Sequence, residues 1–141
     1  MSNLPAQPID GPLADASQVE TWPPGKALFR QGETPHGVYA VLSGEVGLVF
    51  SARNGASRTL RLAQPGDVLG LGDVLSGAPH DCTAMTRTEA TVGCVAAGDL
   101  RRLLAETPSL WLTLLRFLSN DVEACYDCMR AVGAPRRHIA V

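Results

Sequence analysis

Short apolar runs with a period of two fill the middle of the chain. Between Val38 and Leu42, and again between Val46 and Phe50, successive side chains would point to opposite faces of an extended backbone. The same kind of run recurs at Thr59 to Ala63, Cys82 to Thr86 and Ala90 to Ala96. Turn-forming pairs separate the runs at regular intervals, namely Pro24-Gly25, Gln31-Gly32, Ser43-Gly44, Asn54-Gly55 and Pro65-Gly66. The pattern predicts a meander of short β-strands.

The period changes to that of helices after Gly98. Asp99 suits the first turn of a short helix, where a carboxylate meets the positive end of the helix dipole. Thr107-Pro108 then has the form of a cap followed by proline at the first helical position. We therefore expect a second, longer helix from about Ser109 to Val132, which Gly133 and Pro135 end.

The longer helix carries a heptad repeat that is held for three heptads. Its apolar positions are spaced alternately by four and three residues, a pattern that favours pairing with a second helix. They are Trp111, Leu115, Leu118, Val122, Cys125, Met129 and Val132. A flank made of Leu110, Leu114, Phe117 and Tyr126 is expected to pack on the strands. The seam predicts a homodimer interface; the alternative is a helix buried wholly within its own domain.

Composition and charge narrow the class of protein. A net charge of −2 and an isoelectric point near 5.9 do not indicate a nucleic-acid surface, so the chain alone is not expected to bind DNA specifically. The N-terminus has no basic region followed by an apolar stretch, and no run is long enough to span a bilayer. We therefore expect a cytoplasmic protein without membrane contact, whose four cysteines are reduced.

The chain divides into four segments on these patterns. Residues 1–20 are rich in Pro, Ala, Ser and Asp and are expected to form a loose arm, with one short helical turn around Ala14 to Glu20. Residues 21–98 hold the strands and residues 99–133 the two helices. Residues 134–141 are left as a tail.

The segment WPPGKALFRQGETPHGVYAVLSGEVGLVF resembles the opening of cyclic-nucleotide-binding domains in Crp/Fnr regulators. The shared features are the F-x-Q-G-E turn and the Y-x-V-L-S-G-E-V strand-turn-strand, and the likeness continues through QPGDVLGLGDVLSG to about residue 133. The resemblance implies a mainly β protein, an eight-stranded double-stranded β-helix of the jelly-roll-like kind called a β-roll. A short helix and a long dimerisation helix would follow it. Gly32, Gly44 and Gly66 would sit at sharp turns that need positive φ.

The nucleotide ligands of the family are replaced in this sequence. The family's phosphate cassette resembles Gly66 to Thr83, and the likeness places Leu71 at the ribose-binding glutamate and His80 at the phosphate-binding arginine. Asp81 takes the place of the following serine or threonine. Leu71 cannot accept a hydrogen bond, Asp81 would repel a phosphate, and a histidine is only partly charged at neutral pH. We therefore expect no tight binding of cyclic AMP or cyclic GMP.

The effector is expected to bind at the cassette, through a set of residues that the resemblance places there. They are Gly70, Leu71, Gly72, Asp73, His80, Asp81, Cys82 and Thr83. His80 is the strongest single candidate because a neutral imidazole can bind haem iron, and the alternative is a polar loop residue. Haem or another small effector stays open as the cofactor. No cysteine precedes Cys82, which argues against an iron-sulfur cluster of the Fnr kind.

The remaining candidate motifs favour structural roles. Cys125 and Cys128 share a helix face, but no further ligands complete a zinc site, so core packing is the expected role. Cys82 and Cys94 fall in strand-like runs and are expected to be buried, inert thiols. The sequence has no His-x-His, no P-loop and no G-x-G-x-x-G that opens a strand-helix unit. We therefore expect no metal site and no enzyme.

These observations favour an effector-sensing domain of a Crp/Fnr-family transcriptional regulator, with a ligand other than cyclic AMP. Only residues 133–141 follow the predicted dimer helix, too few for a helix-turn-helix domain. The chain is then either a truncated regulator or a stand-alone sensor. One alternative is a degenerate binding module that acts through protein-protein contacts. A second alternative is a true cyclic-nucleotide receptor.

Overall fold

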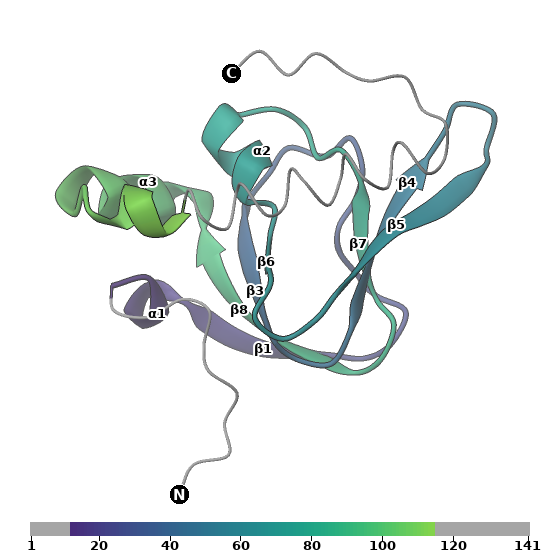
Figure 1. Cartoon of the computed structure of the whole chain (residues 1–141), viewed down its shortest axis with the longest axis horizontal. Helices are drawn as coiled ribbons and strands as arrows, with labels where there is room; N and C mark the ends of the chain where they lie inside the picture. Colours follow the sequence, from purple (N-terminus) through teal and green to yellow (C-terminus); the bar gives the residue numbers. More distant parts are fainter. Residues whose placement is uncertain (1–11, 115–141) are drawn as a thin grey trace, which may run out of the picture.

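A computed structural model describes residues 12–114 of the chain (Figure 1). Within this range the chain forms eight strands, three complete helices and the start of a further helix at residue 110, in an order that places a short helix inside the run of strands. The elements are α1 (Pro12–Ala16), β1 (Gln18–Trp22), β2 (Ala27–Phe29), β3 (Gly37–Ser43), β4 (Val46–Ser51), β5 (Ser57–Ala63), β6 (Val68–Leu69), α2 (Leu71–Ser76), β7 (Thr83–Thr86), β8 (Ala90–Ala96) and α3 (Ala97–Glu106). The expectation of a mainly β domain followed by helices is confirmed.

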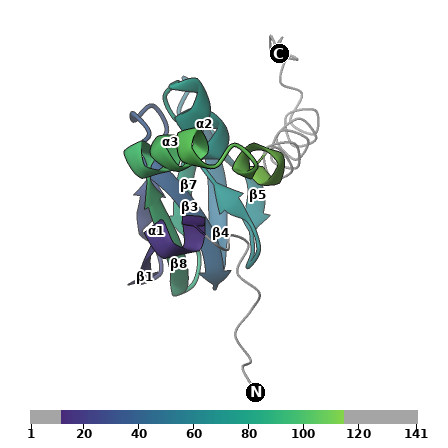
Figure 2. The same cartoon turned by 90° about the vertical axis from the view of Figure 1, so that its left-hand side faces the viewer.

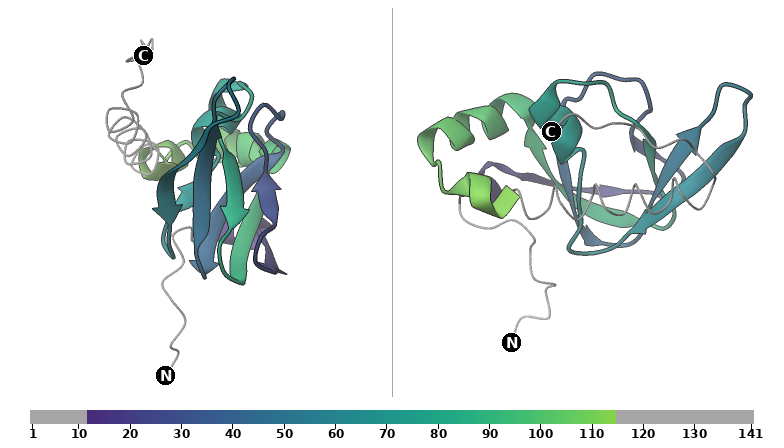
Figure 3. Two further views of the ribbon diagram at one scale, coloured as in Figure 1. Left: turned by 90° about the vertical axis from the view of Figure 1, so that its right-hand side faces the viewer. Right: turned by 45° about the horizontal axis from the view of Figure 1, so that its top comes forward.

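The strands form two four-stranded antiparallel sheets. The first sheet has the order β1-β8-β3-β6 and the second the order β2-β7-β4-β5. β4 and β5 form a hairpin that projects on the side of the molecule away from α3, as the right panel of Figure 3 shows. Because β1 pairs with β8 along its whole length, from Gln18 opposite Cys94 to Trp22 opposite Ala90, the start and the end of the strand region lie side by side.

The N-terminal segment differs from the loose arm that its composition predicts. Residues 12–16 are helical, and β1 begins at Gln18. Leu13 of α1 is buried in the core, and the Oγ of Ser17 donates to the carbonyl oxygen of Ala14 over 2.7 Å. Pairing with β8 therefore gives an extended conformation to a segment whose polar composition alone does not predict a strand.

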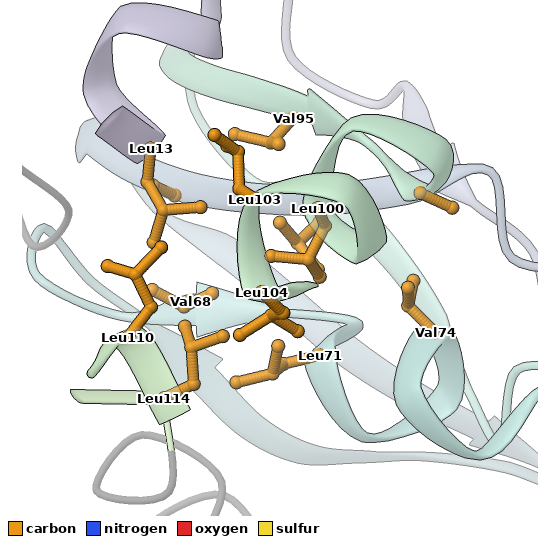
Figure 4. Packing of buried hydrophobic residues seen from close by; sticks show 13 residues of the cluster. Leu13, Val68, Leu71, Val74, Val95, Leu100, Leu103, Leu104, Leu110 and Leu114 are labelled. Atoms are coloured by element: carbon orange, nitrogen blue, oxygen red, sulfur yellow. The ribbon is translucent and has the colours of Figure 1, made fainter. Parts of the chain in front are cut away.

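Two separate hydrophobic clusters lie on opposite faces of the first sheet. β3 contributes to both because its side chains alternate: Val38 and Ala40 pack on the helix side, while Tyr39 and Val41 face the interior of the roll. α1 and α3 cover the outer face of this sheet (Figure 2). Figure 4 shows the helix-side cluster, in which α3 contributes Leu100, Leu103 and Leu104. Burying each of these leucines contributes about 1.5–3 kcal/mol to folding.

The start of the predicted long helix lies at the end of the described range. Residues 110–114 are helical, and the backbone N–H of Leu110 donates to the carbonyl of Thr107 over 3.0 Å. Leu110 and Leu114 are buried in the helix-side cluster, as predicted for the flank. Trp111, the first seam residue, is 42% exposed. The other seam positions, Leu115, Leu118, Val122, Cys125, Met129 and Val132, lie outside the described residues, as do Phe117, Tyr126 and Cys128.

Glycine is required at the sharp turn between β3 and β4. Gly44 has φ 83°, and a Cβ there would overlap the carbonyl oxygen of Glu89 and lie 2.7 Å from the Cα of Ala90. The positive φ expected at Gly32 and Gly66 is also present, at 88° and 105°.

In the described part of the chain, no helix has the length and hydropathy of a membrane span.

Candidate functional site

The cassette is a short helix and a loop that join β6 to β7. α2 begins after Gly70, whose φ of 82° turns the chain out of β6. Gly77 ends the helix with φ 74° and donates its N–H to the carbonyl of Asp73 over 2.9 Å. A Cβ on Gly70 would lie 3.3 Å from the carbonyl oxygen of Gly37 and 3.4 Å from Cε1 of His80. Glycine at this position therefore lets β3 and the cassette loop approach closely.

His80 is the centre of the site, and it is buried rather than presented to solvent. Its side chain is held on two sides: Nδ1 lies 2.9 Å from Oδ2 of Asp73, and the ring stacks on Phe29 with centroids 3.8 Å apart and planes at 16°. Only 3% of the residue is exposed. His80 is thus a polar loop residue whose ring is enclosed by Phe29 and Gly70.

The backbone of His80 is also held, by two hydrogen bonds to the F-x-Q-G-E turn. Its N–H donates to the carbonyl of Glu33 over 3.0 Å, and its carbonyl accepts from the N–H of Gly32 over 2.9 Å. The F-x-Q-G-E turn, which also supplies Phe29, thus holds the cassette loop beside the strand that follows it, since β2 pairs with β7. The side-chain carboxylate of Glu33 accepts from the N–H of Arg30 over 2.8 Å and stabilises this turn.

Asp73 is the anionic partner of His80. Burial raises the pKa of the Asp73 carboxyl above its ordinary value, the hydrogen bond from His80 lowers it, and the nearby charge of Asp81 raises it again. A half-buried carboxylate beside a buried imidazole forms a self-satisfied pair. Two groups that could otherwise contact a ligand are therefore bonded to each other.

Leu71 points away from this pair. It is 1% exposed and packs in the helix-side cluster with Leu100 and Leu104 of α3 (Figure 4). The side chain that the sequence resemblance places at the family's ribose-binding glutamate thus takes part in the core between the cassette helix and α3. An apolar residue there stabilises the contact of the two helices rather than offering an acceptor to a ligand.

The structure brings together only some of the residues expected at the site. Gly70, Asp73 and His80 meet, while Gly72 lies in the first turn of α2. Asp81 is exposed, and Cys82 is buried in the roll interior. Thr83 accepts a hydrogen bond at Oγ1 from the N–H of Gln31 over 3.0 Å, so its hydroxyl helps hold the turn.

Phe29 and Glu33 are site residues that the sequence did not single out for this role. Both lie in the F-x-Q-G-E segment, which was noted only for the family likeness. The motif places an aromatic ring and a tight turn together, but nothing in its spacing indicates that they would enclose a residue of the cassette.

A haem iron would have to be bound through Nε2 of His80, because Nδ1 faces Asp73. The residue is 3% exposed, so the imidazole is not open to a haem in this arrangement of the loop. Among the residues that the structure describes, no three His, Cys, Asp or Glu side chains are grouped so that they could hold a metal ion.

Two antiparallel sheets joined through a helix-and-loop cassette, followed by helices, define a ligand-sensing β-roll. The model of the cyclic nucleotide-binding domain matches residues 19–107, and the chain belongs to that family. Domains of this family are typically regulatory modules without catalytic activity.

Similar proteins include regulators and a protein of undescribed role. An uncharacterised protein of Haemophilus influenzae is 27% identical over 106 residues, which cover 75% of this chain and 82% of that protein. The CRP-like cAMP-activated global transcriptional regulator of Mycobacterium tuberculosis is 29% identical over 108 residues, covering 77% of this chain. The chain spans 48% of the length of that regulator.

The fold is also similar to that of a solved regulator. The crystal structure of the Thermus thermophilus catabolite activator protein superimposes with a TM-score of 0.74, covering 86% of this chain and 57% of that protein. Sequence identity over the match is 23%, so this likeness concerns the fold alone. Together with the family match, it relates the chain to the sensory domains of Crp-like regulators.

Proposed function

We propose that the chain is a sensory domain of the Crp/Fnr type whose cassette responds to an effector other than cyclic AMP. The observation that carries this proposal is the pair of His80 and Asp73, with Nδ1 and Oδ2 2.9 Å apart and the imidazole buried against Phe29. A cyclic phosphate needs a cation that faces it. His80 is turned toward a carboxylate of its own chain instead.

The missing ribose acceptor supports the same conclusion. Leu71 lies in the core under α3, so no carboxylate is available from that position. A charged hydrogen-bond partner removed from a buried site costs about 1.5–3 kcal/mol. The loss of both the arginine and the glutamate would weaken nucleotide binding by two or more orders of magnitude, because about 1.4 kcal/mol corresponds to a factor of ten.

Calorimetric titration of the full chain with cyclic AMP and cyclic GMP tests the proposal. We expect no heat of binding at micromolar nucleotide. A dissociation constant in the micromolar range or below would contradict the proposal and would favour an ordinary cyclic-nucleotide receptor. The control is a titration of the double variant Asp73→Ala/His80→Arg. It introduces an arginine at position 80 and removes the carboxylate that would otherwise bind it. That variant is expected to gain affinity over the wild-type chain.

A second candidate is an interaction module whose cassette binds no small molecule. The enclosed His80 and Asp73 pair supports this candidate too, because both partners are already satisfied. The uncharacterised Haemophilus protein, most of which is matched, suggests that such a domain can form the greater part of a protein. Native mass spectra and absorption spectra of the purified protein separate the candidates: a bound small molecule favours the sensor, and its absence favours the module.

We also propose that the chain forms a homodimer through the helix that begins at residue 110. The two faces at the start of that helix already differ, since Leu110 and Leu114 are buried on the roll while Trp111 and Leu112 are 42% and 73% exposed. Apolar side chains on the outer face would be covered by the partner helix. In a regulator, a change at the cassette would then alter the arrangement of the helix pair.

A further inference from the structure

A second site lies at the end of the first sheet, where β1 begins and β8 leads into α3, separate from the cassette. A cavity of about 290 Å³ opens where β1, β3 and β8 lie side by side (Figure 1). Alternate residues of β1 line it together with paired residues of β3 and β8. The side chains that matter are Gln18, Glu20, Trp22, Tyr39, Cys94 and Asp99.

Negative charge dominates this cavity. Glu20 and Asp99 both line it, and no lysine or arginine does; His36 is the basic residue at the wall. The ion pair of Asp99 with Arg102 is long, at 3.4 Å, and both side chains are largely exposed, so it neutralises Asp99 only weakly. A cation is therefore favoured in the cavity over an anion.

Two other titratable side chains in the cavity wall, those of Cys94 and Tyr39, are neutral near neutral pH. Burial, then the charge of Glu20 and a hydrogen bond to it, raise the pKa of the Cys94 thiol to about 12. Burial is also the largest cause that raises the pKa of Tyr39, and the charges of Cys94, Glu20 and Glu33 add to it. The thiol is thus a protonated neighbour of Glu20, neither a metal-binding thiolate nor a positive group.

Aromatic surface and an unused donor complete the site. Trp22 and Tyr39 both line the cavity, and their rings can contact a cation through their faces. The indole Nε1 of Trp22 is buried and has no hydrogen-bond acceptor among the described residues. A buried N–H without a partner is destabilising, so a ligand atom that accepts this hydrogen bond would be stabilised.

We propose that this cavity binds a small organic cation, an ammonium compound that also carries an oxygen acceptor. Glu20 and Asp99 would balance its charge, the rings of Trp22 and Tyr39 would contact the ammonium group, and the indole N–H would donate to the oxygen. The volume is at the small end of ligand pockets, which suits a compound of this size. The site uses no cassette residue and does not depend on the function proposed above.

Titration of the ¹⁵N-labelled full chain with choline tests the proposal by NMR. The indole N–H signal of Trp22 is identified by its loss in Trp22→Phe, since Trp111 supplies the other indole signal. We expect choline to shift the Trp22 signal in a saturable way at millimolar concentration. The neutral compound 3,3-dimethylbutan-1-ol has the same shape without the charge, and we expect it to bind at least about tenfold more weakly.

Matched variants locate the binding. Glu20→Gln keeps the shape of the side chain and removes its charge, and we expect choline affinity to fall about tenfold, with a smaller fall for Asp99→Asn. Glu89→Gln, in the exposed turn before β8, changes the net charge equally and is expected to leave the affinity unchanged. No saturable shift with choline, equal binding of the neutral compound, or equal effects of Glu20→Gln and Glu89→Gln would each overturn the proposal.

Discussion

Arg101 of α3 donates a hydrogen bond from Nη2 to the carbonyl oxygen of Val74 in α2, over 3.1 Å. Carbonyls in the last turn of a helix have no partner within that helix, and the arginine satisfies one of them for the cassette helix. Beneath this bond, Leu71 and Val74 pack with the leucines of α3. α2 of the cassette and α3 therefore share both a polar and an apolar contact. A displacement of α2 would thus also change the position of α3.

Arg101→Ala is expected to lower the free energy of unfolding by about 1 kcal/mol, the typical contribution of one hydrogen bond. Urea denaturation of the full chain measures this. Arg102→Ala is the matched control, because Arg102 is exposed and forms only the weak pair with Asp99; we expect little change there. Equal losses in the two variants would mean that the bond to Val74 does not hold α2 in place.

Asp73→Asn should change the pH dependence of stability in a defined direction. Burial raises the pKa of Asp73 in the folded chain above its ordinary value of 3.8, so the folded state holds this proton more tightly than the unfolded state. The contribution of Asp73 to stability is therefore fully present below pH 3.8 and is lost as the pH rises through the raised pKa. Relative to Asp73→Asn, the wild-type chain should lose stability over that window.

Thermal unfolding across the acid range up to neutral pH checks this sign. Asp81→Asn is the companion variant, since the charge of Asp81 is one of the causes that raise the pKa of Asp73. We expect it to move the window to lower pH. A wild-type advantage that grows with pH would show instead that the bond to His80 outweighs burial.

Gly44→Ala should destabilise the chain more than Gly55→Ala. Both glycines have positive φ, 83° and 87°, so both variants suffer backbone strain, which costs about 1–3 kcal/mol. A Cβ at Gly55 meets nothing within 4 Å, whereas at Gly44 it overlaps the backbone of Glu89 and Ala90. We expect Gly44→Ala to cost about 2 kcal/mol more in chemical denaturation. Similar losses in the two variants would argue against the close approach of the two turns.

Cys94 should react slowly with iodoacetamide near neutral pH. Its thiol has a pKa of about 12 and only the thiolate is nucleophilic. Glu20→Gln removes a charge that helps to hold the proton on the thiol, so alkylation of Cys94 should accelerate, by up to about tenfold for each pKa unit lost. Mass spectrometry of the peptide that contains Cys94 gives the rate. An unchanged rate would mean that burial alone protects the thiol.

The strands were the part of the fold most readily predicted from sequence. In β3 the alternation of Val38 and Ala40 with Tyr39 and Val41 corresponds to two real clusters, one on each face of the sheet. β1 was missed because four of its five residues are exposed and it lacks such alternation. Its conformation depends on pairing with β8, and that long-range contact leaves no periodic signal in the segment itself.

The sequence indicates which segment of the chain would form the candidate site, but it does not indicate how the side chains of that site contact one another. The cassette and the exchange at His80 stay predictions of the family likeness, which gives no indication of the bond from His80 to Asp73, because that bond depends on how the loop after α2 folds back. The stacking partner, Phe29, comes from β2, which is far away in the sequence and pairs with the strand that follows the loop. The direction of Leu71 toward α3 was equally unpredictable, because the likeness gives its position in the chain and not the face that it occupies.

The predicted seam makes the oligomeric state sensitive to a single charge. Leu118→Glu would place a carboxylate among seam side chains that each contribute about 1.5–3 kcal/mol when covered, so the dimer should dissociate. Light scattering of the full chain measures the oligomeric state, and an intact dimer would contradict the seam.

If the helices pair in parallel, mild oxidation should give a covalent dimer that Cys125→Ser abolishes and Cys128→Ser does not.

The pairing of β1 with β8 also bears on how the chain folds as it is made. β1 is synthesised first, but its only partner in the first sheet is a strand from the far end of the roll. Contacts between distant segments require closure of a large loop and slow the folding of small domains. β1 must therefore remain unpaired until β8 leaves the ribosome. α3 follows β8 without a break, so closure of the roll and docking of the helix are expected to form one late, cooperative step.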